Sequence, residues 1–539
     1  MRGQMMAFPL TLQHVFNRAQ RLFPNKEIVS RTGPGQTHRY TYADFGRRAR
    51  QLASALAELG VRRGDRVGTF AWNSFRHFEA YFAVPCSGAV LHTVNIRLFP
   101  EQVAYVINHA EDRVLLVDAS LLRLLAPLKP QLRSVERVVV FPDGGDPSVW
   151  PGPALDYEEL LARAAPIERF PELDEEDAAG ICYTSGTTGH PKGVVYSHRA
   201  QFLHAFGVCL ADTVALSEAD TVLPVVPMFH ANAWGMPYAA TLAGAKLVFP
   251  GPAPTPADLA QLMADEGVTL AAGVPTVWIG LQAALEQGRY DLSKLKRLVV
   301  GGSAVPRGLI QAFEEKWGIP IWQAWGMTEM TPLGSVARIK STLERLSPEE
   351  QLDLRATQGL PVPGVEAKAI DDAGNEVPWD GKTMGELVVR GPWVTAGYYQ
   401  DPTSAERFTA DGWFRTGDVV TIDPEGYIQI TDRTKDLVKS GGEWISSVAL
   451  ENALMGHPKV LEAAVIARPD PKWGERPIAC VVLRPGAEAT AEELLEHLRP
   501  RFASWWVPDA VVFVSEIPKT SVGKFDKKAL RDRAAAGKL

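Results

Sequence analysis

The segment YTSGTTGHPKG, residues 183–193, decides how the rest of this chain is interpreted. It holds three glycines, four Ser or Thr hydroxyls and one lysine, and it has too few apolar residues to build a core. The glycines let consecutive backbone N–H groups turn towards an anion. The hydroxyls can donate to phosphate oxygens or bind magnesium, and the lysine adds a mobile positive charge. The segment therefore predicts a triphosphate-binding loop, made of Thr184, Ser185, Gly186, Thr187, Thr188, Gly189 and Lys192.

Turn chemistry alone allows a simpler interpretation of the same segment. A run of Gly, Ser and Thr is typical of an exposed surface loop. The segment also differs from the G-x-x-x-x-G-K-[ST] phosphate loop, because Pro191 stands where that pattern requires its second glycine.

Length and composition restrict the classes of protein that fit. A chain of 539 residues exceeds a single core, and it should contain at least two domains. The formal charge of −7 and the lack of a basic run with interleaved aromatics argue against nucleic acid as a main partner. The four cysteines include no C-x-x-C pair, which argues against a disulfide framework or a zinc site and favours a reducing cytoplasm.

No segment predicts secretion or a membrane span. The N-terminus lacks the apolar region of a signal peptide, and residues 12–22 instead show helical periodicity. The most apolar stretch, residues 269–285, is shorter and more polar than a spanning helix needs. Loose peripheral contact with a membrane stays open.

Alternating helix and strand patterns predict an α/β fold with layered sheets covered by helices. The predicted helices before the phosphate loop cover residues 44–59, 75–84 and 100–109, and the strands cover 66–72, 89–94 and 113–117. After the loop, helices are expected at 201–210 and 256–266, and strands at 221–226, 246–249, 297–300 and 386–390. A hairpin is expected at 421–431.

Three further segments carry candidate binding groups. The strand at 297–300 runs into Gly301–Pro306, which fits either an adenine shelf or an ordinary strand-to-helix turn. Thr328 and Glu329 follow a turn and could hold phosphate and magnesium, although a glutamate in a turn is common. A Thr-Gly-Asp turn is expected to hold Asp418 where a carboxylate suits the two hydroxyls of a ribose.

The last hundred or so residues have their own pattern of helices and strands, as a separate domain would. We expect an N-terminal domain over residues 1–431, a linker over 432–437 and a small mobile α+β domain over 438–539. Lys524 lies on a glycine-flanked turn before a basic helix. It is either part of a solvated face or a cation that can reach into the other domain.

Five ordered motifs resemble the acyl-adenylate-forming superfamily: YTSGTTGHPKG, QAWGMTE, WFRTGD, DRTKDLVKSGGEWIS and PKTSVGK. With PMFHANAW at residues 227–234, the likeness is strongest to bacterial long-chain fatty acyl-CoA synthetases. The resemblance implies that ATP and a fatty acid give acyl-AMP and pyrophosphate, and that coenzyme A then displaces AMP. It also implies a homodimer that makes contact through the N-terminal segment.

The resemblance also assigns roles to residues. For ATP and magnesium, it implies Thr184 and Glu329 as magnesium ligands, Gly302, Trp322, Gln323 and Thr328 as adenine and phosphate contacts, Asp418 as the ribose acid, and Arg433 or Lys435 as a sugar or phosphate contact. In the C-terminal part, it implies Lys439 and Trp444 as contacts near the adenylate, Lys524 as the lysine that stabilises pentavalent phosphorus, and Asp436 as the hinge. For the acyl group, it implies His230, Ala231 and Trp234 as the gate segment.

The substrate is inferred less directly. Phe229 is followed by His230, where amino-acid-activating relatives carry an aspartate, so an apolar acyl tail is favoured. Trp234 resembles the gate of a fatty-acyl tunnel, but it fits a plain core aromatic equally well. Three alternatives stay open: a ligase for medium-chain or aryl acids, an acyl-nucleotide-binding protein without turnover, and a luciferase-like oxygenase.

Overall fold

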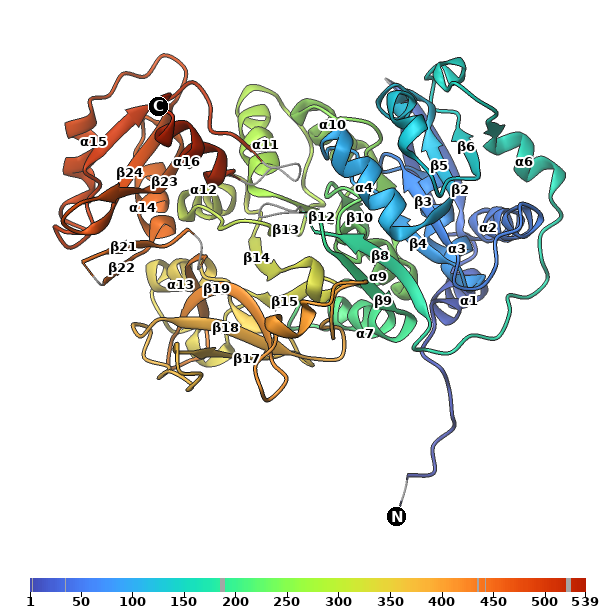
Figure 1. Cartoon of the computed structure of the whole chain (residues 1–539), viewed down its shortest axis with the longest axis horizontal. Helices are drawn as coiled ribbons and strands as arrows, with labels where there is room; N and C mark the ends of the chain where they lie inside the picture. Colours follow the sequence, from blue (N-terminus) through green and yellow to red (C-terminus); the bar gives the residue numbers. More distant parts are fainter. Residues whose placement is uncertain (2, 34, 185–189, 434–435, 442, 520–524) are drawn as a thin grey trace.

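The computed structural model describes residues 1, 3–33, 35–184, 190–433, 436–441, 443–519 and 525–539. Ser185–Gly189, Lys435 and Lys524, which the sequence assigns to the site, lie outside this part of the chain. Its strands form four sheets, and helices pack around them in an α/β arrangement (Figure 1).

The largest sheet is mixed: its central strands are parallel and its edges antiparallel. In spatial order its strands are β16 (Leu360–Pro361), β15 (Leu333–Val336), β14 (Ile321–Gly326), β13 (Arg297–Val300), β12 (Leu270–Gly273), β10 (Thr221–Pro224), β11 (Lys246–Phe249), β1 (Glu27–Gly33) and β2 (Gln36–Thr41). Because β13 and β14 are parallel neighbours, the segments that follow them emerge at the same edge. Gly301 and Thr328 are thereby brought to one end of the sheet.

A second, seven-stranded sheet carries the phosphate-loop segment. Its order is β7 (Leu155–Asp156), β6 (Arg137–Phe141), β5 (Asp112–Asp118), β3 (Arg66–Phe70), β4 (Val90–Thr93), β8 (Ala178–Tyr183) and β9 (Gly193–Ser197). Strands β8 and β9 are antiparallel, with Tyr183 opposite Gly193. These two strands pair as the arms of a β-hairpin, whereas a Walker loop joins a strand to a helix.

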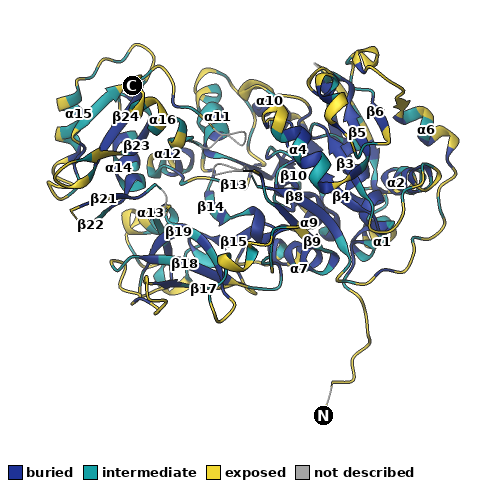
Figure 2. Ribbon diagram, viewed as in Figure 1, coloured by how far each residue is buried: buried dark blue, intermediate teal, exposed yellow. Residues whose placement is uncertain are grey.

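Helices bury their apolar faces between and around these sheets (Figure 2). The main core draws side chains from α1, α2, α3, α7 and α9 and from strands of both large sheets. The helices are α1 (Leu12–Leu22), α2 (Tyr42–Glu58), α3 (Phe75–Cys86), α4 (Pro100–Ala110), α5 (Leu122–Leu125), α6 (Tyr157–Arg163), α7 (His198–Cys209), α8 (Ala231–Trp234), α9 (Met236–Ala243), α10 (Pro256–Glu266), α11 (Pro275–Gln287), α12 (Arg307–Trp317), α13 (Pro348–Arg355), α14 (Ser447–Met455), α15 (Ala491–Leu498) and α16 (Lys527–Ala535).

Two smaller sheets complete the described chain. The four-stranded sheet contains β17 (Glu366–Ile370), β18 (Gly385–Arg390), β19 (Phe414–Ile422) and β20 (Ile428–Arg433). The five-stranded sheet contains β21 (Val438–Ser440), β22 (Glu443–Ile445), β23 (Val460–Asp470), β24 (Gly474–Leu483) and β25 (Ala510–Phe513). The elements after residue 437 gather at one end of the molecule, opposite the first helices (Figure 1). Residues 432–437 connect these two sheets, and the division into domains there stays a prediction.

Most expected elements of the large sheets form close to their predicted bounds. The strands at 246–249 and 297–300 and the helix at 256–266 match residue for residue. The expectation for Asp418 is wrong in one respect, because Thr416 and Gly417 lie inside strand β19 and form no turn. Gly417 has a φ of +74° within that strand, so the glycine bends a strand where a turn was expected. In the part of the chain that the structure describes, no helix combines the length and the apolar character needed to cross a bilayer.

Candidate active site

The base of the phosphate loop is closed by two hydrogen bonds between its ends. The Thr184 backbone N–H donates to the carbonyl of Lys192 at 2.9 Å. The Lys192 N–H donates to the Thr184 hydroxyl oxygen at 3.1 Å. The hydroxyl still has its own proton and a second lone pair, so it can serve a phosphate or a cation.

Lys192 lies beside residues 398–401, which the sequence analysis did not assign to the site. Its ammonium is 2.8 Å from the Asp401 carboxylate and 4.9 Å from the centre of the Tyr398 ring. The hydrogen bond from Lys192, together with bonds from Thr403, lowers the pKa of Asp401 to about 2. Asp401 is therefore an anion at neutral pH and holds the lysine at the mouth of the loop.

Thr328 and Glu329 form a short 3-10 turn directly after β14. The Tyr196 hydroxyl of β9 donates to the Thr328 carbonyl at 2.7 Å, which ties this turn to the strand after the phosphate loop. Glu329 is 7% exposed, and one of its oxygens accepts a hydrogen bond from the Tyr398 hydroxyl at 2.6 Å. The turn is thus tied to β9, the strand that follows the phosphate-loop segment, and to Tyr398.

The segment after β13 is fixed by Gln323. The Gln323 side-chain oxygen accepts from the Val305 N–H at 2.7 Å, and its amide donates to the carbonyls of Ala356 and Thr357. Gly302 has a φ of +86°, which favours glycine. Gln323 thereby has a clear structural role, and its direct contact with adenine stays a prediction.

Trp322 points to the opposite face of β14 from Gln323, because side chains alternate along a strand. Its ring lies 3.9 Å from the Arg338 guanidinium and 5.3 Å from that of Arg297. The structure gives Trp322 a packing role between two arginines. A cofactor contact by Trp322 remains untested.

Asp418 and Arg433 face each other across strands β19 and β20. One Asp418 oxygen lies 3.4 Å from the Arg433 side chain, and the other accepts from the Trp325 indole N–H at 2.9 Å. Trp325 belongs to the QAWGMTE motif but was not assigned a role from the sequence. The indole links the expected ribose acid to β14, the strand that precedes the Glu329 turn.

The gate segment has a left-handed backbone. Ala231, Asn232, Ala233 and Trp234 have φ values of 43°, 52°, 50° and 56°. Each such residue costs about 1–2 kcal/mol in an L-chain, and strain of this kind gathers at functional sites. A Cβ atom on Gly301 would lie 3.3 Å from the Trp234 indole, so Trp234 lies against the start of the segment Gly301–Pro306. His230, also assigned to the gate segment, is the N-cap of this turn and has an extended φ of −123°.

The predicted residues after 435 lie in the last part of the chain. Lys439 and Trp444 are opposite each other on β21 and β22, with the ammonium 5.3 Å from the indole ring. Asp436 accepts a hydrogen bond from Arg531 of α16 at 2.6 Å. Among the described residues, no hydrogen bond, ion pair or ring contact joins Lys439 or Trp444 to Glu329 or Asp418.

Sequence reasoning missed Trp325, Tyr398 and Asp401. Trp325 could have been found from its place between two assigned residues of one motif. Tyr398 and Asp401 lie in AGYYQDPT, residues 396–403, where the visible signal was only a turn.

The segments that follow the parallel strands β13 and β14 thus lie at one edge of the large sheet, and the Glu329 turn is tied to β9. The AMP-binding enzyme family profile matches residues 16–399, and the profile of the AMP-binding enzyme C-terminal domain matches residues 449–524. The chain therefore belongs to the AMP-binding enzyme family.

Individual relatives cover nearly the whole chain. The long-chain-fatty-acid–CoA ligase of Thermus thermophilus is 54% identical over 98% of this chain and 96% of its own. The 3-methylmercaptopropionyl-CoA ligase of Ruegeria lacuscaerulensis is 47% identical over 99% and 98%, and the medium-chain-fatty-acid–CoA ligase of Ectopseudomonas oleovorans 45% over 99% and 97%. The crystal structure of the anthranilate CoA ligase AuaEII with anthranoyl-AMP aligns with a TM-score of 0.87 at 26% identity, covering 100% of both chains.

These findings confirm the expected class of enzyme. The chain is an AMP-forming acyl-CoA ligase that uses ATP, Mg²⁺ and coenzyme A. The donor set fits this chemistry, because Mg²⁺ prefers one or two carboxylate or hydroxyl oxygens plus substrate phosphates. The non-catalytic and luciferase-like alternatives are not supported by these relatives.

Proposed function

We propose that this ligase activates long-chain fatty acids. The main support for this proposal is the gate segment. Its strained left-handed turn places the Trp234 indole against Gly301, and the small apolar residues Ala231 and Ala233 lie beside it. A swinging indole there would open an apolar path next to the place where acyl-AMP forms. The Thermus thermophilus relative, named for long-chain acids, supports this preference.

In this proposal the chain acts by binding and charge compensation. The fatty-acid carboxylate attacks the α-phosphorus of ATP; a new O–P bond forms and the bond to pyrophosphate breaks. Glu329 and Thr184 would hold Mg²⁺, which neutralises phosphate charge when bound. Lys192 and Lys524 add positive charge where the transition state gains negative charge, and Asp418 holds the ribose.

The second half-reaction needs a different group at the same site. The thiol of coenzyme A attacks the acyl carbon, a C–S bond forms and the C–O bond to AMP breaks. We propose that Asp436 is the pivot about which residues 438–539 turn between the two steps. In this account the enzyme works in the cytoplasm as a homodimer that makes contact through its N-terminal segment.

A medium-chain or otherwise shorter acid is the second candidate. Buried polar side chains lie in the gate segment and next to it. The amide oxygen of Asn232, within the segment, accepts hydrogen bonds from the Gln201 amide at 3.2 Å and from the Cys182 thiol at 3.4 Å. The Gln201 oxygen and the Asn232 nitrogen are buried without a hydrogen-bond partner among the described residues. Such atoms suit a short or polar acyl group better than a long alkyl tail.

Pyrophosphate release separates these candidates. The protein is assayed with ATP and Mg²⁺ across saturated acids of increasing chain length and benzoate, with and without coenzyme A. Release that peaks at long chains, with acyl-CoA formed only when the thiol is present, supports the proposal. A peak at medium-chain or aromatic acids contradicts the long-chain preference. Trp234→Ala should change the chain-length profile and leave the dependence on ATP concentration unchanged.

A further inference from the structure

A connector between β18 and β19, residues 395–401, bridges the two segments proposed to bind ATP. The Thr395 N–H donates to the backbone carbonyl of Glu329 at 2.7 Å. The Tyr399 N–H donates to the carbonyl of Gly193, just after the phosphate loop, at 2.8 Å. The connector therefore fixes the distance between the Glu329 turn and Gly193, at the start of β9.

Tyr398 is the side chain of this connector that meets both charged groups. Its hydroxyl donates to one Glu329 oxygen at 2.6 Å, and the tyrosine is 9% exposed. A carboxylate held at one oxygen presents the other in a fixed direction, which is how outer partners orient metal ligands. Without this bond, Glu329 would be free to rotate about its terminal torsion.

The ring of the same tyrosine lies against Lys192. The ammonium is 4.9 Å from the ring centre, and an aromatic face attracts a cation at this distance. Asp401 completes this arrangement through its ion pair with Lys192, while Thr403 donates to Asp401 from its backbone at 2.9 Å and its hydroxyl at 2.7 Å. The lysine is thus held ready beside the loop by two neighbours.

We propose that Tyr398 is a positioning residue for ATP activation, which orients the Glu329 carboxylate through its hydroxyl and holds Lys192 with its ring. This inference rests on the proposed roles of Glu329 and Lys192. It predicts separable effects, since the hydroxyl serves the carboxylate and the ring serves the lysine. Of the two charged groups Glu329 and Lys192, Asp401 contacts only Lys192 among the described contacts.

The neighbouring Tyr399 offers a matched control. Its hydroxyl accepts a hydrogen bond from Gln400 at 3.1 Å, and its ring packs against His109. Tyr399→Phe removes an equivalent hydroxyl from the same connector without touching Glu329 or Lys192. Any general effect of the substitution on the connector would appear in both variants.

The test measures Mn²⁺ binding in the presence of ATP by electron paramagnetic resonance, and the half-saturating Mg²⁺ concentration in ATP–pyrophosphate exchange. Tyr398→Phe should weaken metal binding about 10–100-fold, the range for partners of metal ligands. Tyr399→Phe should match the wild type in both measurements. Asp401→Asn should change the KM for ATP and leave the half-saturating Mg²⁺ concentration unchanged.

Glu329→Gln distinguishes a failure of the proposed magnesium-binding role of Glu329 from a failure of the positioning role of Tyr398. If Glu329→Gln leaves Mn²⁺ binding unchanged, the proposed function of Glu329 fails, and the inference fails with it. If Glu329→Gln weakens binding and Tyr398→Phe does not, the inference alone is overturned. A thermal unfolding midpoint for Tyr398→Phe within the range of the Tyr399→Phe control excludes general unfolding as the cause of weaker binding.

Discussion

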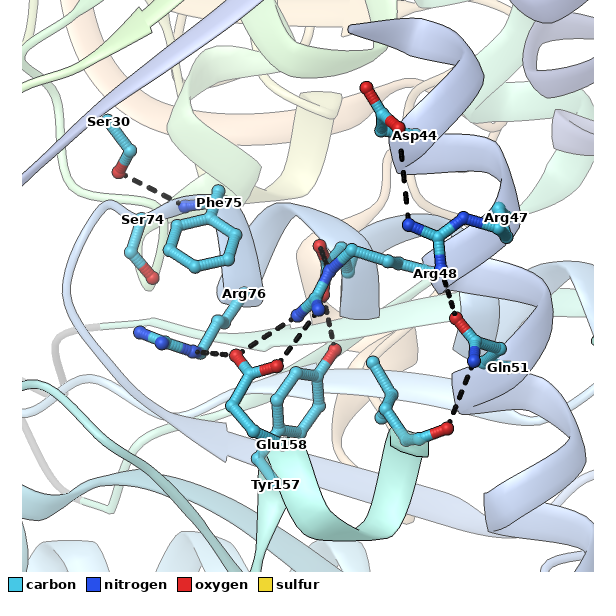
Figure 3. A network of polar contacts seen from close by, with 12 residues as sticks. Ser30, Asp44, Arg47, Arg48, Gln51, Ser74, Phe75, Arg76, Tyr157 and Glu158 are labelled. Carbon is cyan, nitrogen blue, oxygen red and sulfur yellow. Dashed lines mark hydrogen bonds and ion pairs between the residues drawn. The ribbon is translucent and has the colours of Figure 1, made fainter. Parts of the chain in front are cut away.

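Two buried ionic networks differ in how their charges balance. The body network consists of Arg48, Arg76, Glu79, Tyr157 and Glu158, between α2, α3 and α6 (Figure 3). The linker network consists of Asp432, Ser447, Glu451 and Lys527, at the start of the expected linker. The body network has two cations for two anions, whereas the linker network has one cation for two anions.

In the body network, each carboxylate is paired with an arginine. Arg48 contacts Glu79 at 2.7 Å and Glu158 at 2.9 Å, and Tyr157 donates to Glu79 at 2.6 Å. Although burial opposes its charge, hydrogen bonds from Arg48 and Arg76 lower the pKa of Glu158. Burial raises the pKa of the Glu79 carboxyl, and Arg48 opposes this shift. The network holds α6 against α2 and α3.

The linker network is short of positive charge. Lys527 contacts Glu451 at 2.7 Å and donates to the Ser447 hydroxyl, which in turn donates to Asp432. Burial raises the pKa of Glu451 to about 7 and also raises that of Asp432. Burial thus raises a carboxyl pKa in both networks, and it brings the pKa of Glu451, which shares a single cation with Asp432, to about 7.

Removing the central cation of the body network should have the largest effect. Arg48→Ala leaves Glu79, which is fully buried, without its partner. We expect a loss of about 3–5 kcal/mol in the free energy of unfolding, the usual cost of an uncompensated buried charge. Urea unfolding measures it, with the exposed Arg47→Ala as the control, expected within about 0.5 kcal/mol of wild type. Equal losses in both variants would contradict a special role for Arg48.

Removing the linker cation should cost less, and the cost should depend on pH. In Lys527→Met, Glu451 can take up a proton near neutral pH, so we expect a loss of about 1–3 kcal/mol that grows between pH 6 and 8. Denaturant unfolding across this range measures it. Lys528→Met, on the exposed side of α16, serves as the control. A loss in Lys527→Met that is constant with pH would show that the carboxylates do not titrate.

The wild type should show the same titration directly. Because the folded-state pKa of Glu451 lies above its ordinary value of 4.5, the folded state binds this proton more tightly. The stabilising contribution is complete below the unfolded pKa and is lost as pH rises through about 7. The stability difference between wild type and Glu451→Gln should change by at most about 1.4 kcal/mol per pH unit in this window. Parallel pH profiles would exclude Glu451 as the titrating group.

The smallest expected effect concerns the ion pair between Arg531 and Asp436. Its side chains are 27% and 12% exposed, so we expect about 0.3–1 kcal/mol of coupling. If residues 438–539 turn at Asp436, Arg531→Ala should change the ratio of the two half-reaction rates by up to about fivefold. The exposed Arg533→Ala should leave this ratio unchanged. An unchanged ratio in Arg531→Ala would separate the ion pair from any turning step.

Local patterns could predict much of the fold from the sequence, because they depend on neighbours along the chain. The helix expected at 44–59 begins after Thr41, whose side chain accepts a hydrogen bond from the Asp44 N–H, and ends one residue earlier than expected. Long-range contacts carry no such signal. Trp325 meets Asp418 across 93 residues, and Tyr398 meets Glu329 across 69, so only the folded chain reveals these partners.

The candidate site residues show the same difference between local patterns and long-range contacts. The glycines and hydroxyls of residues 183–193 predict phosphate binding from composition alone, whereas the contacts of Tyr398 with Glu329 and of Asp401 with Lys192 arise only because the chain between β18 and β19 folds beside both residues. The charge balance of the two networks was equally hidden, since Lys527 and Glu451 are 76 positions apart in the sequence.

The most direct measurement compares the two half-reactions in Lys524→Ala with those of the wild type. The account predicts that acyl-AMP formation falls by roughly 10²–10³-fold, as on loss of a transition-state donor. Conversion of supplied acyl-AMP and coenzyme A to acyl-CoA should stay near the wild-type rate. Equal loss of both half-reactions would contradict the assignment of Lys524 to the first step alone, and with it the proposal that the C-terminal residues present different groups in turn.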